Sequence, residues 1–340
     1  MIKITTYDFL SKNSIAFVLV RNEFKEKIKN QIQAEHSSLK TFSKKYFKMS
    51  DSTLKNEFRI SQYLKFDRLM RIANILSIQK AEVYDEIKAV FARGSSTSKR
   101  IFLPKELNVD ESFVEGYALY LAEGDNGSNG RTKPRKLRFT NSNLAVHKLF
   151  IDWLKCHFPG NYFYFKVLIP QEKAFSKEDS DNIKTLLRIE DNQIRTQTCR
   201  WKRKTGFVYR TCLDSALVID LILEIENKIK DICRKNKKLA AAYIRGMMVG
   251  EGTAYFNRSR YVRIEMKNQK EIEYLHKLFI LLGFKCEPSV RAERDCMWSI
   301  YIGAKQLKKY NDLIGFGVHV ARQKILNAAV DKKLRKNQFG

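Results

Sequence analysis

The sequence predicts an α+β protein made of two copies of one helix–strand–strand–helix–strand–strand–helix (αββαββα) unit, preceded by an all-α domain. Three observations lead to this fold class. Two short apolar segments, 116–124 and 244–252, have small residues at their third and seventh positions and end in Glu-Gly. Similar alternating stretches follow both segments. The region 37–80 has the residue spacing of short helices.

Each apolar segment is expected to form a helix with its small residues on one face, because residues four apart share a helix face. Side chains this small let two helices pack closer than the usual distance of about 8–10 Å. Glu123 and Glu251, one at the end of each helix, would then face each other. The residues expected at this helix interface are Ala118, Ala122, Gly246 and Gly250.

A stretch that alternates basic and apolar residues follows each segment, at 131–141 and 256–268, as is typical of a half-buried strand. Both stretches end in Asn and lead into a helix containing His-Lys-Leu-Phe. His147 lies 24 residues after Glu123 and His276 lies 25 residues after Glu251, which indicates a duplicated unit. The predicted units span 100–235 and 236–340; further strands are expected at 161–169, 206–211, 284–291 and 298–302, with an excursion at 171–204.

Residues 1–95 are predicted to form the N-terminal helical domain. Within 37–80, a short helix, a tight turn, a polar helix and an amphipathic helix resemble the repressor-type (Xre-like) helix-turn-helix, with 50–59 as the recognition helix. Its expected DNA-facing side chains are Ser50, Ser52, Thr53, Lys55, Asn56 and Arg59. A small helical bundle with a solvated face is the alternative. The polar stretch 93–100 is interpreted as a linker.

The charge balance indicates a polyanionic partner. The chain has 64 basic and 37 acidic residues, a net charge of +27, and nucleic acid is the first candidate. A generally solvated basic surface is the alternative. The six Cys show no CxxC spacing and the five His no HxxxH pattern, which argues against a zinc site and indicates a reducing compartment. We expect no membrane segment and no secretion, and hence a cytoplasmic (nucleoid-associated) or organellar location.

Two carboxylates at helix C-terminal ends are disfavoured by the helix dipole and by each other. A divalent cation would compensate, and hard oxygen ligands suit Mg²⁺, or Mn²⁺ in its place. The last-turn carbonyls of Ala122 and Gly250 could complete the coordination. A Glu that points into solvent from the end of its helix is the alternative for each acid.

The paired segments resemble the LAGLIDADG motif pair of homing endonucleases, over about residues 100–330. The resemblance implies two pseudo-symmetric units whose sheets form a saddle over the DNA major groove. It implies a monomeric, metal-dependent double-strand DNA endonuclease for intron homing, with Glu123 and Glu251 as catalytic metal ligands, one for each strand. The sequence departs from the motif at Ala118, where Gly is usual, and in having Glu rather than Asp as both acids.

Basic and polar residues on the predicted strands would contact DNA, although a solvated charge is an equal interpretation for any single one. The candidates for base contacts are Arg138, Thr140 and Asn141 in the first copy and, as their partners, Arg263, Lys267 and Asn268 in the second. The candidates for phosphate contacts include Arg131, Arg135, Lys202, Arg258 and Arg260. A basic residue is expected near each acid; Arg210, Lys267 and Lys305 are the candidates.

Relatives of this fold that do not cleave DNA define the alternative function. They include bacterial transcription regulators of the WhiA type and intron maturases, which assist RNA folding. The alternative is therefore a non-cleaving DNA-binding regulator, or a maturase with intron RNA as its partner. The presence of an acid in both motif copies favours the nuclease.

Overall fold

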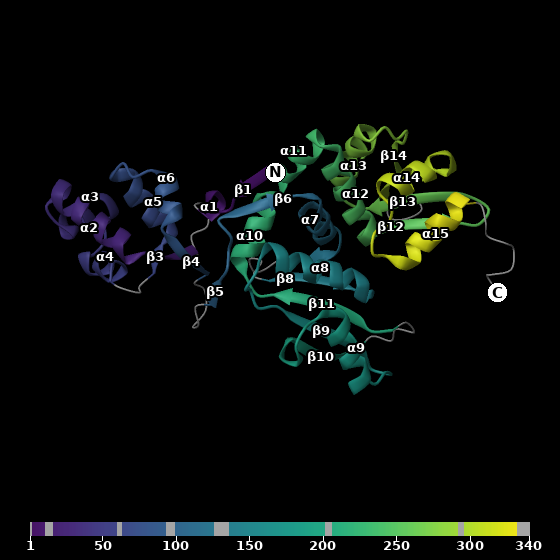
Figure 1. The fold of residues 1–340 in the computed structure, drawn as a ribbon, viewed down its shortest axis with the longest axis horizontal. Coiled ribbons are helices and arrows are strands. Elements are labelled where there is room, and N and C mark those ends of the chain that lie inside the picture. Colours follow the sequence, from purple (N-terminus) through teal and green to yellow (C-terminus); the bar gives the residue numbers. More distant parts are fainter. Residues whose placement is uncertain are drawn as a thin grey trace.

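The computed structural model describes residues 2–10, 16–59, 63–92, 99–125, 136–200, 206–291 and 296–331. An N-terminal domain lies at one end of the molecule, and two α+β units follow along its length (Figure 1). The fold class is as predicted: a mixed α+β chain with two repeated units. No helix in the described ranges is long and apolar enough to cross a membrane.

The first unit is a five-stranded sheet with helices packed against it, and its strand order is β10-β9-β11-β8-β7. Its elements are α7 (Glu111–Glu123), β7 (Gly124–Asp125), β8 (Leu137–Asn141), α8 (Leu144–His157), β9 (Tyr164–Pro170), α9 (Lys177–Leu187), η1 (Asp191–Gln193), β10 (Ile194–Cys199), β11 (Val208–Leu213), α10 (Ala216–Glu224) and α11 (Glu226–Lys235). The aromatic side chains of Phe139, Phe150 and Phe165 are fully buried between the sheet and α8.

The second unit is a four-stranded sheet with the order β12-β13-β15-β14. Its elements are α12 (Lys237–Glu251), β12 (Gly252–Phe256), β13 (Arg260–Met266), α13 (Gln269–Leu281), β14 (Pro288–Arg291), β15 (Met297–Gly303), η2 (Ala304–Gln306), α14 (Leu307–Leu313) and α15 (Val320–Asp331). Apart from β10, both sheets have the same strand order, so the predicted αββαββα unit occurs twice. The excursion at 171–204 holds α9 and β10, and β10 pairs parallel to β9.

Strand register defines which residues of the two units are equivalent. Gly124 pairs with Phe139, and Gly252 pairs with Ile264. Arg138 is therefore equivalent to Arg263, as predicted. The predicted matches of Thr140 with Lys267 and of Asn141 with Asn268 are wrong, because the equivalent residues are Glu265 and Met266. Asn268 corresponds to Asn143: these two side chains cap the N-termini of α13 and α8.

The two His-Lys-Leu-Phe stretches lie on different turns of equivalent helices. His147 comes four residues after the cap Asn143, whereas His276 comes eight residues after the cap Asn268. A shift of four residues keeps a side chain on almost the same helix face, so the apolar pattern survives the misalignment. The residue equivalent to His147 is Ile272, and both are fully buried.

Helices α7 and α12 pack backbone to backbone through the predicted small residues. A Cβ placed on Gly246 would fall on the carbonyl oxygen of Glu115 and lie 2.9 Å from the Ala118 Cβ. A Cβ on Gly250 would lie 2.6 Å from the Ala122 Cβ and 3.0 Å from the Glu123 Cγ. The absence of these atoms allows the close approach, and it brings the ends of the two helices together.

The N-terminal domain contains a sheet, so the expectation that it is all-α is wrong. Its helices α2 (Asn22–His36), α3 (Leu39–Phe47), α4 (Asp51–Glu57), α5 (Phe66–Ile75) and α6 (Lys80–Asp85) accompany the strands β2 (Ala16–Val20), β3 (Leu64–Lys65), β4 (Ile87–Ala92) and β5 (Lys99–Ile101) in the order β3-β2-β4-β5. The reason is local: β2 alternates buried and half-buried side chains, which suits a strand. Its apolar residues bury one face of this sheet against the helices.

The chain begins outside that domain. Strand β1 (Ile2–Thr5) pairs antiparallel with β6 (Glu106–Val109), which directly precedes α7. Helix α1 (Tyr7–Leu10) lies between the two parts. The Tyr7 ring packs on Phe66 and Tyr84, and the Thr6 hydroxyl donates to the carbonyl of Pro104.

Candidate functional site

The site is centred on Glu123 and Glu251, which end α7 and α12. Asn141, at the end of β8, donates from Nδ2 to Glu123 Oε1 over 2.9 Å. Burial and the nearby negative charge of Glu251 raise the pKa of Glu123 to about 7, against the opposing effect of Arg322 and Asn141. Burial also raises the pKa of Glu251. A pair of carboxylates in this setting favours either a proton or a bound cation.

A cationic side chain lies at the same point. Arg322, on α15, donates from Nη1 to three carbonyl oxygens in the last turn of α12: Met248 at 3.0 Å, Val249 at 2.7 Å and Gly250 at 2.9 Å. These groups would otherwise be the unsatisfied end of the helix. The guanidinium therefore caps α12 and adds a positive charge beside both acids.

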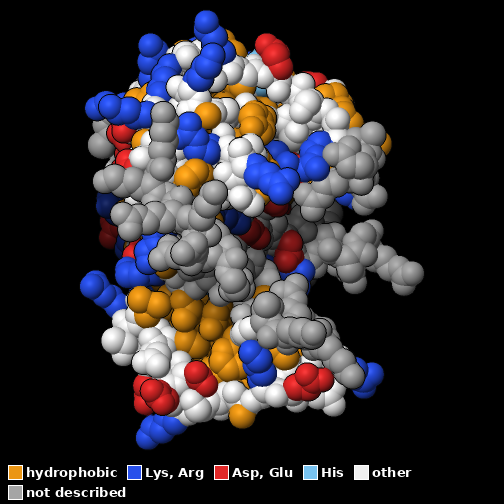
Figure 2. All heavy atoms as spheres, turned by 90° about the vertical axis from the view of Figure 1, so that its right-hand side faces the viewer, with side chains coloured by type: hydrophobic (Ala, Val, Ile, Leu, Met, Phe, Trp, Pro, Cys, Tyr) orange, Lys and Arg blue, Asp and Glu red, His pale blue; other side chains and the backbone are white. Residues whose placement is uncertain are grey.

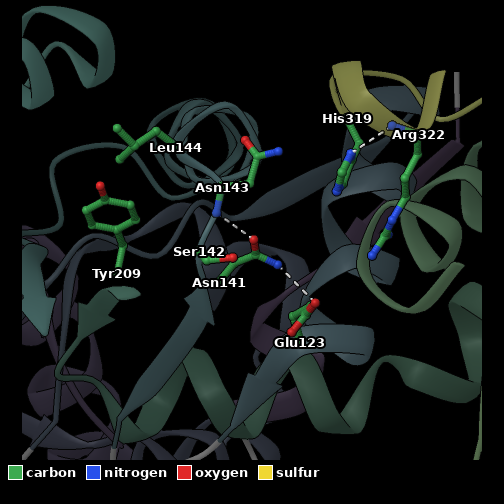
Figure 3. A pocket seen from close by; sticks show the side chains of 8 residues that line it. All are labelled: Glu123, Asn141, Ser142, Asn143, Leu144, Tyr209, His319 and Arg322. Carbon is green, nitrogen blue, oxygen red and sulfur yellow. Dashed lines mark hydrogen bonds between the residues drawn. The ribbon is translucent and has the colours of Figure 1, made fainter. Parts of the chain in front are cut away.

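A polar pocket of ≈ 570 Å³ opens beside Glu123. In Figure 3, Glu123 and Asn141 lie on one side of it, and His319 and Arg322 face them from the second unit. Its lining residues are Glu123, Asn141, Ser142, Asn143, Leu144, Tyr209, His319 and Arg322. The pocket thus joins both units, and its lining includes Glu123 but not Glu251.

The first sheet turns a polar and basic face away from α8. On β8 and β11, Thr140 pairs with Arg210, whose Nε donates to Thr140 Oγ1 at 2.9 Å. Arg138 lies two residues before Thr140 on the same strand, and its guanidinium binds the Asp125 carboxylate. Lys166 on β9 donates to Gln197 Oε1 at 3.1 Å. Two of the three predicted base-contact residues of this unit, Arg138 and Thr140, lie on this face, whereas Asn141 turns to the acid.

The second sheet carries aromatic side chains on the corresponding face. The Tyr255 and Tyr261 rings stack at 4.9 Å, and Tyr301 lies 4.6 Å from Tyr261. Arg263 lies over Tyr261 and pairs with Glu265 at 3.3 Å. Glu265 also accepts from Arg291 at 2.6 Å, so one acid neutralises part of this face.

The other predicted DNA-binding residues lie apart from each other. Arg260 donates to the carbonyl of Ala329 at 2.8 Å and thereby holds α15 instead of facing outwards. Arg258, Lys267 and Asn268 are exposed. Arg131, Arg135 and Lys202 lie outside the described residues.

The predicted recognition helix corresponds to α4, preceded by the cap residue Ser50. Leu54 and Phe58 are buried, as predicted. The proposed DNA-facing side chains Ser50, Ser52, Thr53, Lys55, Asn56 and Arg59 are all exposed. The buried Lys25 of α2 donates to the carbonyls of Glu57 at 3.3 Å and Arg59 at 2.9 Å, and thereby fixes the end of α4. The helix-turn-helix interpretation stays a prediction.

Sequence reasoning missed Arg322 and His319. The candidates for a basic residue near the acids were Arg210, Lys267 and Lys305, but Arg210 lies on the sheet face and Lys305 is exposed in η2. No local pattern marks Arg322, because it reaches the site through the packing of α15 against β12 and α12. Its only sequence signal is a lone Arg in an otherwise weakly polar helix.

Figure 2 views the molecule from the end formed by the second unit. Lys and Arg side chains gather in the upper part of this face, and acidic side chains lie recessed in the hollow at mid-height. Among the described residues, no group of three or more His, Cys, Asp or Glu side chains converges in a way that could hold a metal.

No protein-family model matches the sequence, and no curated protein matches it. Among solved structures, the chain is similar to I-DmoI in complex with DNA and Mn, at 16% identity and a TM-score of 0.36, over 62% of this chain and 99% of that one. It is similar to the homing endonuclease I-WcaI bound to its DNA recognition sequence, at 12% identity and a TM-score of 0.41, over 64% and 87% of the two chains. Full-length WhiA from Thermatoga maritima gives 11% identity and a TM-score of 0.41, over 68% of this chain and 64% of that one.

Proposed function

We propose that this protein binds double-stranded DNA and cleaves it with a divalent metal ion held between the ends of α7 and α12. The observation that carries the proposal is the meeting of Glu123 and Glu251 beside a polar pocket, on a chain with a net charge of +27. Strongly basic proteins are attracted to nucleic acid, and paired carboxylates attract a hard cation.

The oxygen donors at Glu123 fit such an ion. Glu123 and the carbonyl of Ala122 would hold it beside Glu251, with phosphate and water oxygens as further ligands. The carbonyl of Gly250 already accepts from Arg322, which makes it a poorer ligand than the sequence predicted. When bound, the ion would activate a water molecule and offset the charge that develops on the phosphate.

The chain's own residues would position the substrate. Asn141 holds one oxygen of Glu123 and thereby leaves the other oxygen toward the pocket. Arg138, Thr140 and Arg210 would contact the major groove or its phosphates, together with Arg258 and Lys267 of the second unit. The exposed side of α4 would make a second, separate DNA contact in the N-terminal domain.

A non-cleaving DNA-binding protein, such as a transcription regulator, is the second candidate, and one observation favours it. Arg322 already supplies a positive charge beside both carboxylates, so the pair does not require a metal for its charge balance. Under this alternative the basic surfaces keep their role, and only the chemistry at the acids is lost.

Cleavage of a randomised duplex library with Mg²⁺ distinguishes the two candidates. The nuclease predicts double-strand cuts at a restricted set of sequences, which are absent with EDTA. Glu111→Gln is the matched control, because Glu111 is an exposed acid in the first turn of the same helix as Glu123. Binding without any cut would refute the nuclease and support the second candidate. Binding in either case should weaken steeply with salt.

A further inference from the structure

We infer that the two acids are not equivalent, and that Arg322 takes the place of a metal at the Glu251 half, so that the chain holds one divalent ion, at Glu123. This inference rests on the proposed function, and it assigns the number and the place of the ions. The resemblance in sequence, by contrast, implies one ion site for each motif.

The end of α12 already has a cation. Arg322 Nη1 donates to the carbonyl oxygens of Met248, Val249 and Gly250 at distances of 3.0, 2.7 and 2.9 Å. A guanidinium is permanently charged, so a divalent ion at these oxygens would have to approach like charge at close range. Three oxygens that accept from one donor are also turned toward that donor rather than toward an open position.

The register of the strands adds a second, independent difference. Asn141 holds Glu123 by a hydrogen bond of 2.9 Å. The equivalent position in the second unit is Met266, which is 9% exposed. A thioether is a soft group and neither donates to a carboxylate nor binds a hard cation. Glu251 therefore has no counterpart of Asn141 at the equivalent position to orient its carboxylate.

The two acids also differ in their surroundings: Glu123 lines a pocket, whereas Glu251 is exposed at the surface. The pocket of ≈ 570 Å³ is lined by Glu123, Asn141 and Ser142, and Arg322 lines it from the second unit. Figure 3 shows the carboxylate of Glu123 directed into this space, with its hydrogen bond to Asn141. An ion that keeps several waters fits a partly enclosed polar space of this kind beside Glu123.

Titration of the full-length chain with Mn²⁺, followed by electron paramagnetic resonance of the free ion, tests the inference without any cleavage assay. We expect one ion per chain in the wild type. Glu123→Gln should weaken its binding at least tenfold, and Glu251→Gln should weaken it less than threefold. Arg322→Met should add a second ion or tighten binding several-fold, whereas Arg322→Lys should leave one ion.

Arg245→Met is the matched control, because Arg245 pairs with Glu115 across the same two helices at 2.8 Å but far from the acids. It should leave one ion, and circular dichroism would verify that each variant is folded. Two ions in the wild type, or equal losses in Glu123→Gln and Glu251→Gln, would overturn the inference and leave the proposed nuclease standing. No bound ion in the wild type or in Arg322→Met, even with a DNA duplex present to supply phosphate ligands and with the ions bound by the duplex alone subtracted, would overturn both. If Arg322→Met does not fold, the wild-type stoichiometry and the two Glu variants still decide.

Discussion

The two units have the same strand order but different chemistry at equivalent positions. In the first unit, Asn141 binds the acid and Arg210 lies on the outer face of the sheet. The second unit has Met266 in the place of Asn141 and Ser299 in the place of Arg210. The second equivalence follows from strand pairing, because Arg210 pairs with Thr140 and Ser299 pairs with Glu265, the equivalent of Thr140. The two units thus share a backbone arrangement, while the side chains beside the acid and on the outer face of the sheet differ. Equivalent residues in such a repeat need not have equivalent roles.

Both units contribute a helix to the interface of α7 and α12, and a substitution there is expected to have the largest effect. Gly246→Ala places a methyl group onto the carbonyl of Glu115, with no flexible side chain to move aside. We expect a loss of roughly 3 kcal/mol or more in the free energy of unfolding, as in overpacked cores. Urea unfolding would measure it. Gly206→Ala is the control, because nothing lies within 4 Å of its added Cβ; equal losses in both variants would contradict the prediction.

The buried histidine of the first unit gives a pH dependence that its equivalent in the second unit, Ile272, cannot give. Complete burial lowers the pKa of His147 to about 4 from its usual 6.5. Between pH 6.5 and pH 4 the histidine is protonated in the unfolded chain but neutral in the folded chain. The free energy of unfolding is therefore highest above pH 6.5 and falls as the pH drops toward 4. The total is on the order of 3 kcal/mol, at about 1.4 kcal/mol for each unit of pKa.

Replacing the histidine with the residue of the other unit, His147→Ile, should remove this part of the pH dependence. The measurement is the difference in unfolding free energy between wild type and variant at pH 7 and pH 4. His276→Gln is the control, since His276 is only partly buried. If the difference in unfolding free energy between wild type and His147→Ile is the same at pH 7 and at pH 4, this pH dependence does not come from His147. The variant also loses the contacts to Thr211 and to the carbonyl of Asn141, which adds a loss that is independent of pH.

The two acids offer a further comparison, through the strand breaks expected of each variant. Under the proposed nuclease, Glu123→Gln should slow the cutting of both strands if the single ion serves both, by roughly 100-fold, a magnitude typical of losing one group that stabilises the transition state. Glu251→Gln should have a smaller effect. Supercoiled plasmid carrying a selected site would report nicking and linearisation separately. Equal effects of the two variants would favour two equivalent sites.

The smallest expected effects concern the outer faces of the sheets. Arg210→Ser copies the second unit into the first and should weaken DNA binding about tenfold, with a salt slope lower by about one. Glu265→Gln keeps the shape of the second face but removes the acid that holds Arg263 and Arg291, so binding should tighten about twofold. Fluorescence anisotropy at several salt concentrations would measure both. Weaker binding in Glu265→Gln would mean that Glu265 serves to position these arginines.

Local patterns could be predicted from the sequence, and long-range packing could not. The small residues before Glu123 and Glu251 and the order of strands and helices follow from spacing within a few residues. The predicted match of Asn141 with Asn268 was wrong because a shift of about one helical turn leaves the apolar residues on the same helix face. Two alignments of the repeat therefore fit the sequence equally well. Arg322 lies more than seventy residues from the carbonyls that it caps, and nothing near it in the sequence marks that contact.

The sheet of the N-terminal domain escaped prediction for a related reason. Its strands β2 and β4 are short and lie far apart in the chain, and the residues between them form helices. Short apolar runs of this kind suit a buried helix as well as a strand, and only their pairing decides. By contrast, Leu54 and Phe58 were correctly predicted as buried, since they are four residues apart and so lie on one face of a single short helix.

The pairing of β1 with β6 gives the N-terminal domain the topology of an insertion. The chain starts in the body of the molecule, leaves it after α1, forms the domain, and returns to pair with its own first strand. Two covalent connections restrain such a domain far more than a single flexible tether. The spacing and helical phase between a DNA contact on α4 and a contact on the sheets would therefore be restricted.

The same topology decides how the domain could be removed. A truncation at residue 95 would also delete β1 and the Thr6 contacts, and so would expose the edge of β6. An internal deletion that joins the end of α1 to β6 through a short linker would keep that strand pair. The molecule can thus be divided by excision from within, but not by shortening from its start.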